Sequence, residues 1–285
     1  MNSTADFKSP YCVLLSLKRD IMKKSPIFMT ICLAGAGLGS TLANADTIEV
    51  ISSGGFYSSM EKLIPLFEKQ TGHTVHLSSG SSMGASPTAI PNRLDRGERF
   101  DVVVLAAPEL SKLAEKGYVD PNSQSPLVNS SIGMAVPKGA PKPDISSAEK
   151  FEKVLLNAKH IGYSASASGT HLEKDVFPSF PPVEYKVISS KAEKVVGDRV
   201  AKRIAEGQFD IGFQQISEIK PFTGKYGQVE LVGPIPAPYQ KVTVFAAGIG
   251  KNSEHAKVAK ELIKFVKSPQ ATQIIEEQGL EQVKE

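Results

Sequence analysis

Three short loops rich in serine and glycine are the segments of this chain best suited to bind an anion. They span residues 52–55, 78–84 and 164–169, and each follows a predicted strand and precedes a predicted helix. Unpaired backbone N–H groups and the positive end of a helix dipole meet at such junctions, and serine hydroxyls add further donors. An ordinary helix N-cap is the simpler interpretation of any one loop. Three loops at equivalent junctions instead favour a shared anion site.

Other chemistries have little support in the sequence. The five histidines form no HExxH cluster, and neither a G-x-S-x-G elbow nor a phosphate-binding P-loop is present. Basic residues between Lys191 and Arg203 alternate with acidic ones along a predicted helix, which is typical of a solvated helix face. There is no basic stripe and no tryptophan to suit nucleic acid. We therefore expect no metal, no cofactor and no nucleic-acid partner.

The loops are positioned by alternating strands and helices. Strands are predicted at residues 47–51, 74–77 and 101–105, with helices at 56–70 and 109–116. The run 101–105 is almost entirely apolar, as expected of a strand that is buried on both faces.

A second block repeats the pattern. The expected strands are 131–136, 160–163, 210–214 and 240–247, and the expected helices are 148–157, 170–177, 195–206, 256–265 and 269–278. This order predicts an α/β fold with mostly parallel sheets and flanking helices, in which the loops at the carboxyl ends of the strands face one crevice.

A secretory signal is predicted at the N-terminus. Lys23 and Lys24 precede an apolar stretch over 26–42, and the small residues at 43–45 form a cleavage site. We expect a leader over 1–45, with the signal proper at 22–45 and cleavage after Ala45. Glycines interrupt the stretch and no stop-transfer charge cluster follows, which argues against a membrane anchor. The expected location is the bacterial periplasm.

The net charge and the cysteines are concentrated in that leader. The 285 residues include 33 basic and 30 acidic ones, and the leader holds five basic and two acidic residues, which leaves 28 of each. Both cysteines, Cys12 and Cys32, also lie in it. The mature chain is therefore expected to be neutral and free of disulfides and thiolate chemistry.

The order of these motifs resembles the type 2 periplasmic solute-binding proteins, above all the molybdate-binding receptors of ABC importers. The resemblance is carried by the first two Ser/Gly loops and by segments 100–104, 203–213 and 265–271. It implies two lobes with the ligand cleft between them, lobe 1 from 46–130 plus 243–285 and lobe 2 from 131–242. It also implies a small anionic ligand, a monomer and, for a receptor, an ABC permease as partner.

The family's ligand positions would fall near Gly55, Ser82, Ser168, Val195 and Gln215. Gly55 and Gln215 stand where the molybdate receptors have a serine and a tyrosine, and the second loop is enlarged ahead of an arginine. Because the planar fork of arginine binds a carboxylate through two hydrogen bonds, these departures favour a carboxylate over molybdate.

A side branch of this family matches further segments. Residues 52–56, 82–84, 90–94, 163–169 and 212–215 resemble the periplasmic aconitate isomerases, enzymes built on the binding fold. This resemblance implies interconversion of trans- and cis-aconitate by an allylic proton shift. The alternative is a non-catalytic receptor that delivers a molybdate-like oxyanion or a carboxylate to an ABC permease.

For this substrate, Arg93 is the expected carboxylate clamp, with a surface helix arginine as the alternative interpretation. The further expected donors are the side chains of Ser53, Ser82, Ser168 and Gln215 and the backbone N–H groups of Gly54, Gly55, Met83 and Gly169. His171 and Tyr163 are the candidates for proton transfer, since both lie beside the third loop. The simpler interpretation is that these two residues have no catalytic role.

Overall fold

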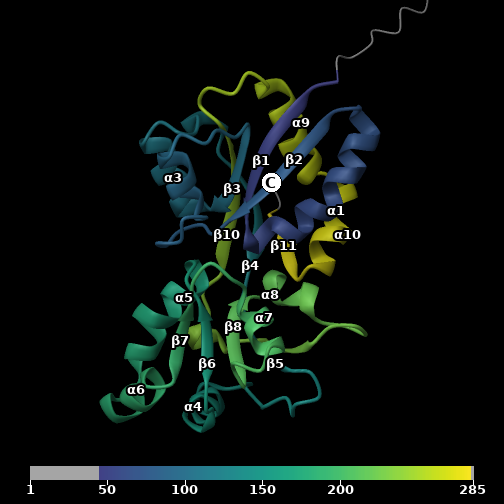
Figure 1. Ribbon diagram of the computed structural model, residues 1–285. Coiled ribbons are helices and arrows are strands. Elements are labelled where there is room, and N and C mark those ends of the chain that lie inside the picture. The colour runs from purple at the N-terminus through teal and green to yellow at the C-terminus, as the bar shows by residue number, and fades with distance from the viewer. Residues whose placement is uncertain (1–44, 284–285) are drawn as a thin grey trace, which may run out of the picture. The chain divides into compact units, whose positions relative to one another are not determined.

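The computed structural model describes residues 45–283, which form two mixed β-sheets flanked by helices (Figure 1). The first sheet has six strands in the order β11-β4-β10-β3-β1-β2. Its strands are β1 (Thr47–Ser53), β2 (Thr74–Gly80), β3 (Val102–Ala106), β4 (Ser125–Ser130), β10 (Thr243–Ile249) and β11 (Leu280–Gln282). Residues from both ends of the described chain therefore share this sheet.

The second sheet has five strands in the order β7-β6-β8-β5-β9. They are β5 (Ile132–Pro137), β6 (Ile161–Ser164), β7 (Ala192–Val195), β8 (Ile211–Gln215) and β9 (Val229–Pro234). The chain enters this sheet directly after β4 and leaves it after β9 to form β10 of the first sheet.

Helices cover the sheets and connect their parallel strands. They are α1 (Gly54–Thr71), α2 (Ile90–Asp95), α3 (Ala107–Glu115), α4 (Ala148–Asn157), α5 (Ala167–His171), α6 (Pro182–Ser189), α7 (Val200–Ala205), α8 (Ile216–Ile219), α9 (Ala256–Val266) and α10 (Pro269–Glu277). Helix α1 ends where Gly72 adopts a left-handed conformation with φ of 80°, which glycine reaches without a steric penalty. Within residues 45–283, no helix has the length and apolar composition needed to cross a bilayer.

The first sheet is packed on both faces. Val102 and Val104 of β3 belong to the cluster formed with α1, α9 and α10, whereas Val103 and Leu105 belong to the cluster formed with α2 and α3. Successive side chains of a strand point to opposite faces, so a continuous apolar run fits a strand covered on both sides. The expectation of a doubly buried strand at 101–105 is confirmed.

Strand register brings the loops together at one end of each sheet. In the first sheet, Ser53 at the end of β1 is opposite Gly80 at the end of β2. In the second sheet, Ser164 at the end of β6 is opposite Val195, and β6 also runs parallel to β8. The segments that follow β6, β7 and β8 are consequently neighbours, although they lie far apart in the sequence.

One predicted helix is wrong at its start. The sequence pattern predicts a helix over 195–206, but Val195 ends β7, and α7 begins only at Val200. Pairing of β7 with β6 and a left-handed Gly197, with φ of 73°, interrupt the helix here. Residues 196–199 therefore form a turn at the carboxyl end of the sheet rather than part of a solvated helix.

Candidate functional site

A cavity of about 340 Å³ lies where the carboxyl ends of strands from both sheets meet. Its size is at the lower end of the range for small-molecule sites. The wall includes residues of all three predicted loops, together with the turn after β7 and the helix after β8. The lining residues are Gly54, Ser79, Gly80, Ser81, Met83, Gly84, Ser86, Thr88, Ser164, Ala165, Ser166, Val195, Gly197, Asp198, Arg199, Gln214 and Glu218.

Three of the predicted site residues, Gly54, Met83 and Val195, are on this wall. Ser53 lies directly before Gly54, is 1% exposed, and its hydroxyl has no hydrogen-bond partner among the described residues. Burial of an unpaired hydroxyl is unfavourable. Because this hydroxyl is already desolvated, a hydrogen bond from it to a ligand would carry little further desolvation cost.

The predicted serines and glycines behind the wall are engaged in the protein's own hydrogen bonds. The Ser82 hydroxyl accepts from the Ala106 N–H at 3.1 Å, and the Ser168 and Ser164 hydroxyls are 2.9 Å apart. The Gly169 N–H donates to the Ser164 hydroxyl at 3.2 Å. These groups hold the second and third loops in shape.

Gln215 and Gly55 make contacts that join the two sheets. The Gln215 side chain accepts from the Ser130 hydroxyl at 2.7 Å and donates to the Thr243 hydroxyl at 3.0 Å. Ser130 and Thr243 are at the two places where the chain passes between the sheets. The Gly55 carbonyl accepts from the Ser217 hydroxyl at 2.6 Å. Both predicted positions are therefore at the junction of the sheets rather than on the cavity wall.

Arg93 is not among the residues that line the cavity. Its guanidinium makes an ion pair with Glu98 at 2.7 Å, donates to the Ser79 carbonyl at 3.0 Å and lies 5.0 Å from the Phe100 ring centroid. The arginine holds the pKa of the Glu98 carboxyl below its usual value. In this structure the predicted clamp binds a carboxylate of its own chain.

The two predicted proton-transfer residues are also engaged elsewhere. The ring nitrogens of His171 are 2.8 Å from the Asp175 carboxylate and 3.0 Å from the Tyr239 carbonyl oxygen. The Tyr163 hydroxyl faces Glu173 at 3.5 Å. Burial, followed by the charge of Glu173, raises the pKa of Tyr163 to about 12. Neither residue is among those that line the cavity.

Arg199 brings a positive charge to the cavity, and sequence reasoning missed it. It is the residue before α7, and its guanidinium carbon lies 6.0 Å from the Tyr57 ring centroid and 5.9 Å from that of Phe222. The neighbouring Asp198 carboxylate is instead bound by Lys202 at 3.1 Å and Arg203 at 3.0 Å. Within residues 45–283, no carboxylate oxygen lies within 4.0 Å of the Arg199 guanidinium nitrogens.

Glu218 is the second residue that sequence reasoning missed. It is the third residue of α8, is 8% exposed and lines the cavity. Burial raises the pKa of its carboxyl to about 7, although the Arg199 charge and donors at Gln215 and Gln214 act in the opposite direction. A carboxyl with a pKa in this range can both accept and release a proton near neutral pH.

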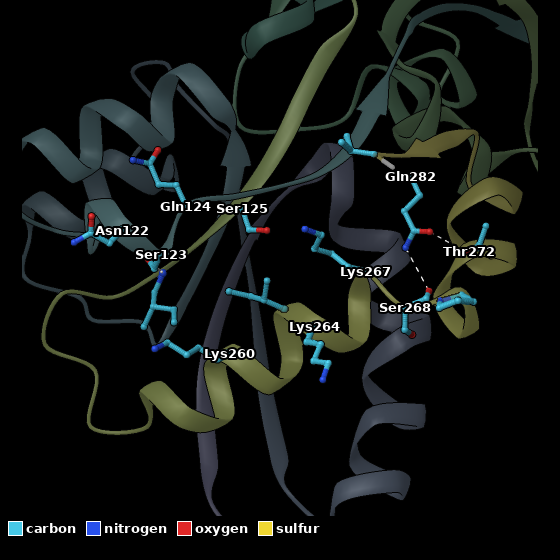
Figure 2. Close-up of a pocket in the computed structure, with 14 residues that line it drawn as sticks. Asn122, Ser123, Gln124, Ser125, Lys260, Lys264, Lys267, Ser268, Thr272 and Gln282 are labelled. Atoms are coloured by element: carbon cyan, nitrogen blue, oxygen red, sulfur yellow. Dashed lines mark hydrogen bonds between the residues drawn. The ribbon is translucent and has the colours of Figure 1, made fainter. Parts of the chain in front are cut away.

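A larger cavity of about 800 Å³ lies elsewhere, against α9 and β11 (Figure 2). Helix α9 and the residue after it contribute Lys260, Lys264 and Lys267, and Gln282 is fixed by hydrogen bonds with Thr272 and the Val266 carbonyl. The described residues that line it include neither a carboxylate nor a histidine, and none belongs to the three Ser/Gly loops. The smaller cavity is therefore the better candidate for carboxylate proton chemistry.

The described residues also place no group of three or more metal-ligating side chains together.

Comparisons with known proteins identify the family and the fold. Residues 48–281 match the family model described as bacterial extracellular solute-binding protein. An aconitate isomerase of Pseudomonas sp is 37% identical over 262 residues, which cover 90% of this chain and 98% of that protein.

Two solved structures share the fold. The periplasmic molybdate-binding protein of Azotobacter vinelandii has a TM-score of 0.64 at 24% identity and covers 84% of this chain and 99% of its own. The sulfate-binding protein of Mycobacterium tuberculosis H37Rv has a TM-score of 0.67 at 17% identity, over 84% and 87% of the two chains.

Proposed function

Because the chain belongs to the bacterial extracellular solute-binding proteins, we propose that it is an isomerase on that binding fold, which interconverts trans- and cis-aconitate. The observation that carries this proposal is the 37% identity to an aconitate isomerase along almost the whole of both chains. Fold alone would not separate an enzyme from a receptor, because one fold hosts many functions. The content of the cavity supports the enzyme.

The cavity suits a small carboxylate. Arg199 supplies a guanidinium with no described carboxylate oxygen within 4.0 Å, and a guanidinium binds a carboxylate through two parallel hydrogen bonds. The unpaired Ser53 hydroxyl and the backbone at the start of α1 supply further donors for the other carboxylates. The N-terminal end of this 18-residue helix also favours negative charge through its dipole.

The proposal includes the setting in which the cavity works. The family is extracellular, and the proposed location is the periplasm, with the leader removed after Ala45; residues 1–44 of that leader lie outside the described part of the chain. The proposed protein is a monomer with two lobes, 46–130 plus 243–285 and 131–242. The separate strand sets of the two sheets support this division.

A receptor for a small anion is the second candidate function. The fold shared with a molybdate-binding and a sulfate-binding protein favours it, and such a receptor would pass its ligand to an ABC permease. The receptor needs the donors of the cavity but has no use for a carboxyl that changes its protonation near neutral pH.

The test is to incubate the purified protein with trans-aconitate and follow the olefinic and methylene signals by proton NMR. We expect cis-aconitate to appear until both isomers reach equilibrium. If no cis-aconitate forms at micromolar protein, while calorimetry detects tight binding of molybdate or sulfate, the protein is a receptor and the isomerase proposal is wrong.

A further inference from the structure

We propose that Glu218 is the catalytic residue that carries the proton between the two allylic carbons of the substrate, and that Arg199 holds a substrate carboxylate beside it. This inference rests on the proposed isomerase function and assigns the group that performs it.

The position of Glu218 makes it accessible to a ligand in the cavity while it stays shielded from bulk water. The short helix α8 follows β8 and packs against α1, and this packing brings the Glu218 carboxylate against Gly54 at the start of α1. A Cβ atom at position 54 would overlap Glu218 Oε1, so the approach depends on glycine there. The carboxylate thus sits at the N-terminal end of α1.

The elements that pack against α8 carry several charged or titratable groups. These are Arg199 and Asp198 in the turn before α7, Tyr57 and Glu61 in α1, Lys220 in the segment after α8, and Glu230 in β9. Arg199 is the charged group that acts on Glu218, and it favours the ionised form. Asp198 is occupied by Lys202 and Arg203, and Glu230 is paired with Lys142 at 3.2 Å. Burial of Glu218 nevertheless outweighs Arg199 and raises its pKa to about 7.

An allylic shift needs a group of this kind. The ionised Glu218 takes a proton from the substrate methylene as that C–H bond breaks, and the released electron pair forms the new C=C bond. The former double bond places its electron pair on the far allylic carbon, which takes the proton back from the Glu218 carboxyl and forms a new C–H bond. The step has no net gain or loss of protons or electrons, so no co-reactant is required. Arg199 disperses the negative charge that the adjacent substrate carboxylate accepts in between.

A structural role is the competing explanation. Glu218 is the third residue of α8, where a glutamate can cap its own helix by accepting from the backbone N–H of the N-cap residue, here Gln215. A capping role would affect the stability of the protein, but it would not make the rate of the reaction depend on the protonation of this carboxyl. The experiment must therefore include a kinetic pH profile as well as a substitution.

The test compares Glu218→Gln with wild type in the trans-aconitate assay, with Glu115→Gln as the matched control. Glu115 is an exposed glutamate at the end of α3. We expect Glu218→Gln to lower kcat by about 10²- to 10⁴-fold, the usual contribution of a general base, with trans-aconitate affinity by calorimetry much less affected. Glu115→Gln should match wild type. In wild type, kcat/KM should fall tenfold per pH unit below about pH 7, because Glu218 must be ionised to accept the proton.

Two results would overturn the assignment. A Glu218→Gln protein that keeps kcat within about threefold of an active wild type would show that the residue does not carry the proton, and would leave the isomerase function intact. A kcat/KM for wild type that stays flat from pH 5.5 to 8.5 would do the same without any variant, even if Glu218→Gln failed to fold. An inactive wild type would instead refute the isomerase proposal, and this assignment with it.

Discussion

Burial of the Glu218 carboxyl should make the stability of the protein depend on pH in a way that Glu218→Gln removes. The folded-state pKa is raised from 4.5 to about 7, so the ionised form is disfavoured in the folded protein. A raised pKa contributes stability that is fully present below the unfolded value and is lost as pH rises through the folded value. One pKa unit corresponds to about 1.4 kcal/mol, so the full cost of ionising Glu218 in the folded state is about 3 kcal/mol.

Glutamine has nearly the same shape and carries no charge at any pH. At pH 5 wild type bears less than about 1 kcal/mol of this cost, whereas at pH 8.5 it bears nearly all of it. We therefore expect Glu218→Gln to gain about 2 to 3 kcal/mol of unfolding free energy relative to wild type between these pH values. For a chain of this size, that gain corresponds to roughly 5 to 10 °C in Tm at pH 8.5.

The assay is urea denaturation of both proteins at pH 5 and pH 8.5 without ligand, followed by circular dichroism. Other titrating groups affect both proteins equally, so the difference between them isolates position 218. Glu115→Gln serves again as control and should follow wild type at both pH values. A difference between Glu218→Gln and wild type that is the same at pH 5 and at pH 8.5 would refute the reasoning, because it would mean that Glu218 ionises in the fold as readily as in the unfolded chain.

Three further substitutions test the neighbouring residues. Arg199→Ala should weaken trans-aconitate binding by about 10- to 100-fold, the range for a lost charge-assisted hydrogen bond. It should also move the acid limb of kcat/KM to higher pH, because a charge that favours ionised Glu218 is gone; an unmoved limb would count against the coupling of Arg199 with Glu218. Ser53→Ala should weaken binding by about tenfold by calorimetry but should not lower the Tm of the free protein, because the hydroxyl has no partner to lose; a destabilised free protein would contradict this view of Ser53. Arg93→Ala should change the trans-aconitate affinity by no more than about twofold, as for a substitution away from the site, because its guanidinium already binds Glu98; a large loss of affinity would return Arg93 to the site.

Much of the fold could be predicted from local patterns. The alternation of apolar runs and amphipathic stretches predicts the α/β architecture and most helices near their observed bounds, although both sheets are mixed rather than mostly parallel. The family resemblance is confirmed by the match over residues 48–281. The strands β4, β7, β9 and β11 were missed, as were the short helices α6 and α8. Most of these elements are six residues or fewer, too short for periodicity to identify.

The location of the candidate site could be predicted from the sequence, but most of the side chains that line it could not. The three Ser/Gly loops do contribute to one cavity, because parallel strands bring their carboxyl ends to one edge. The charge pattern around Arg199 predicts a solvated helix face, and only the pairing of β7 with β6 shows that this residue belongs to a turn facing the cavity. The ion pair of Arg93 with Glu98, five residues on, depends on the turn between them, which no spacing rule predicts.

Glu218 shows most clearly that the remaining site residues can be identified only from tertiary contacts. In the sequence it is one of many glutamates and lies outside every predicted strand and helix, and nothing nearby marks it as unusual. Its burial comes from α1 and its opposing positive charge from the turn before α7, two segments that lie far from it along the chain. A cavity whose charged groups keep their charge would bind a carboxylate and release it unchanged. A cavity that also holds a carboxyl with a pKa of about 7 can take a proton from the ligand and return it. The proposed isomerase therefore needs no new fold: the glycine at 54 leaves room for the Glu218 carboxyl, and the proposed proton transfer is added to a binding cavity that the fold already supplies.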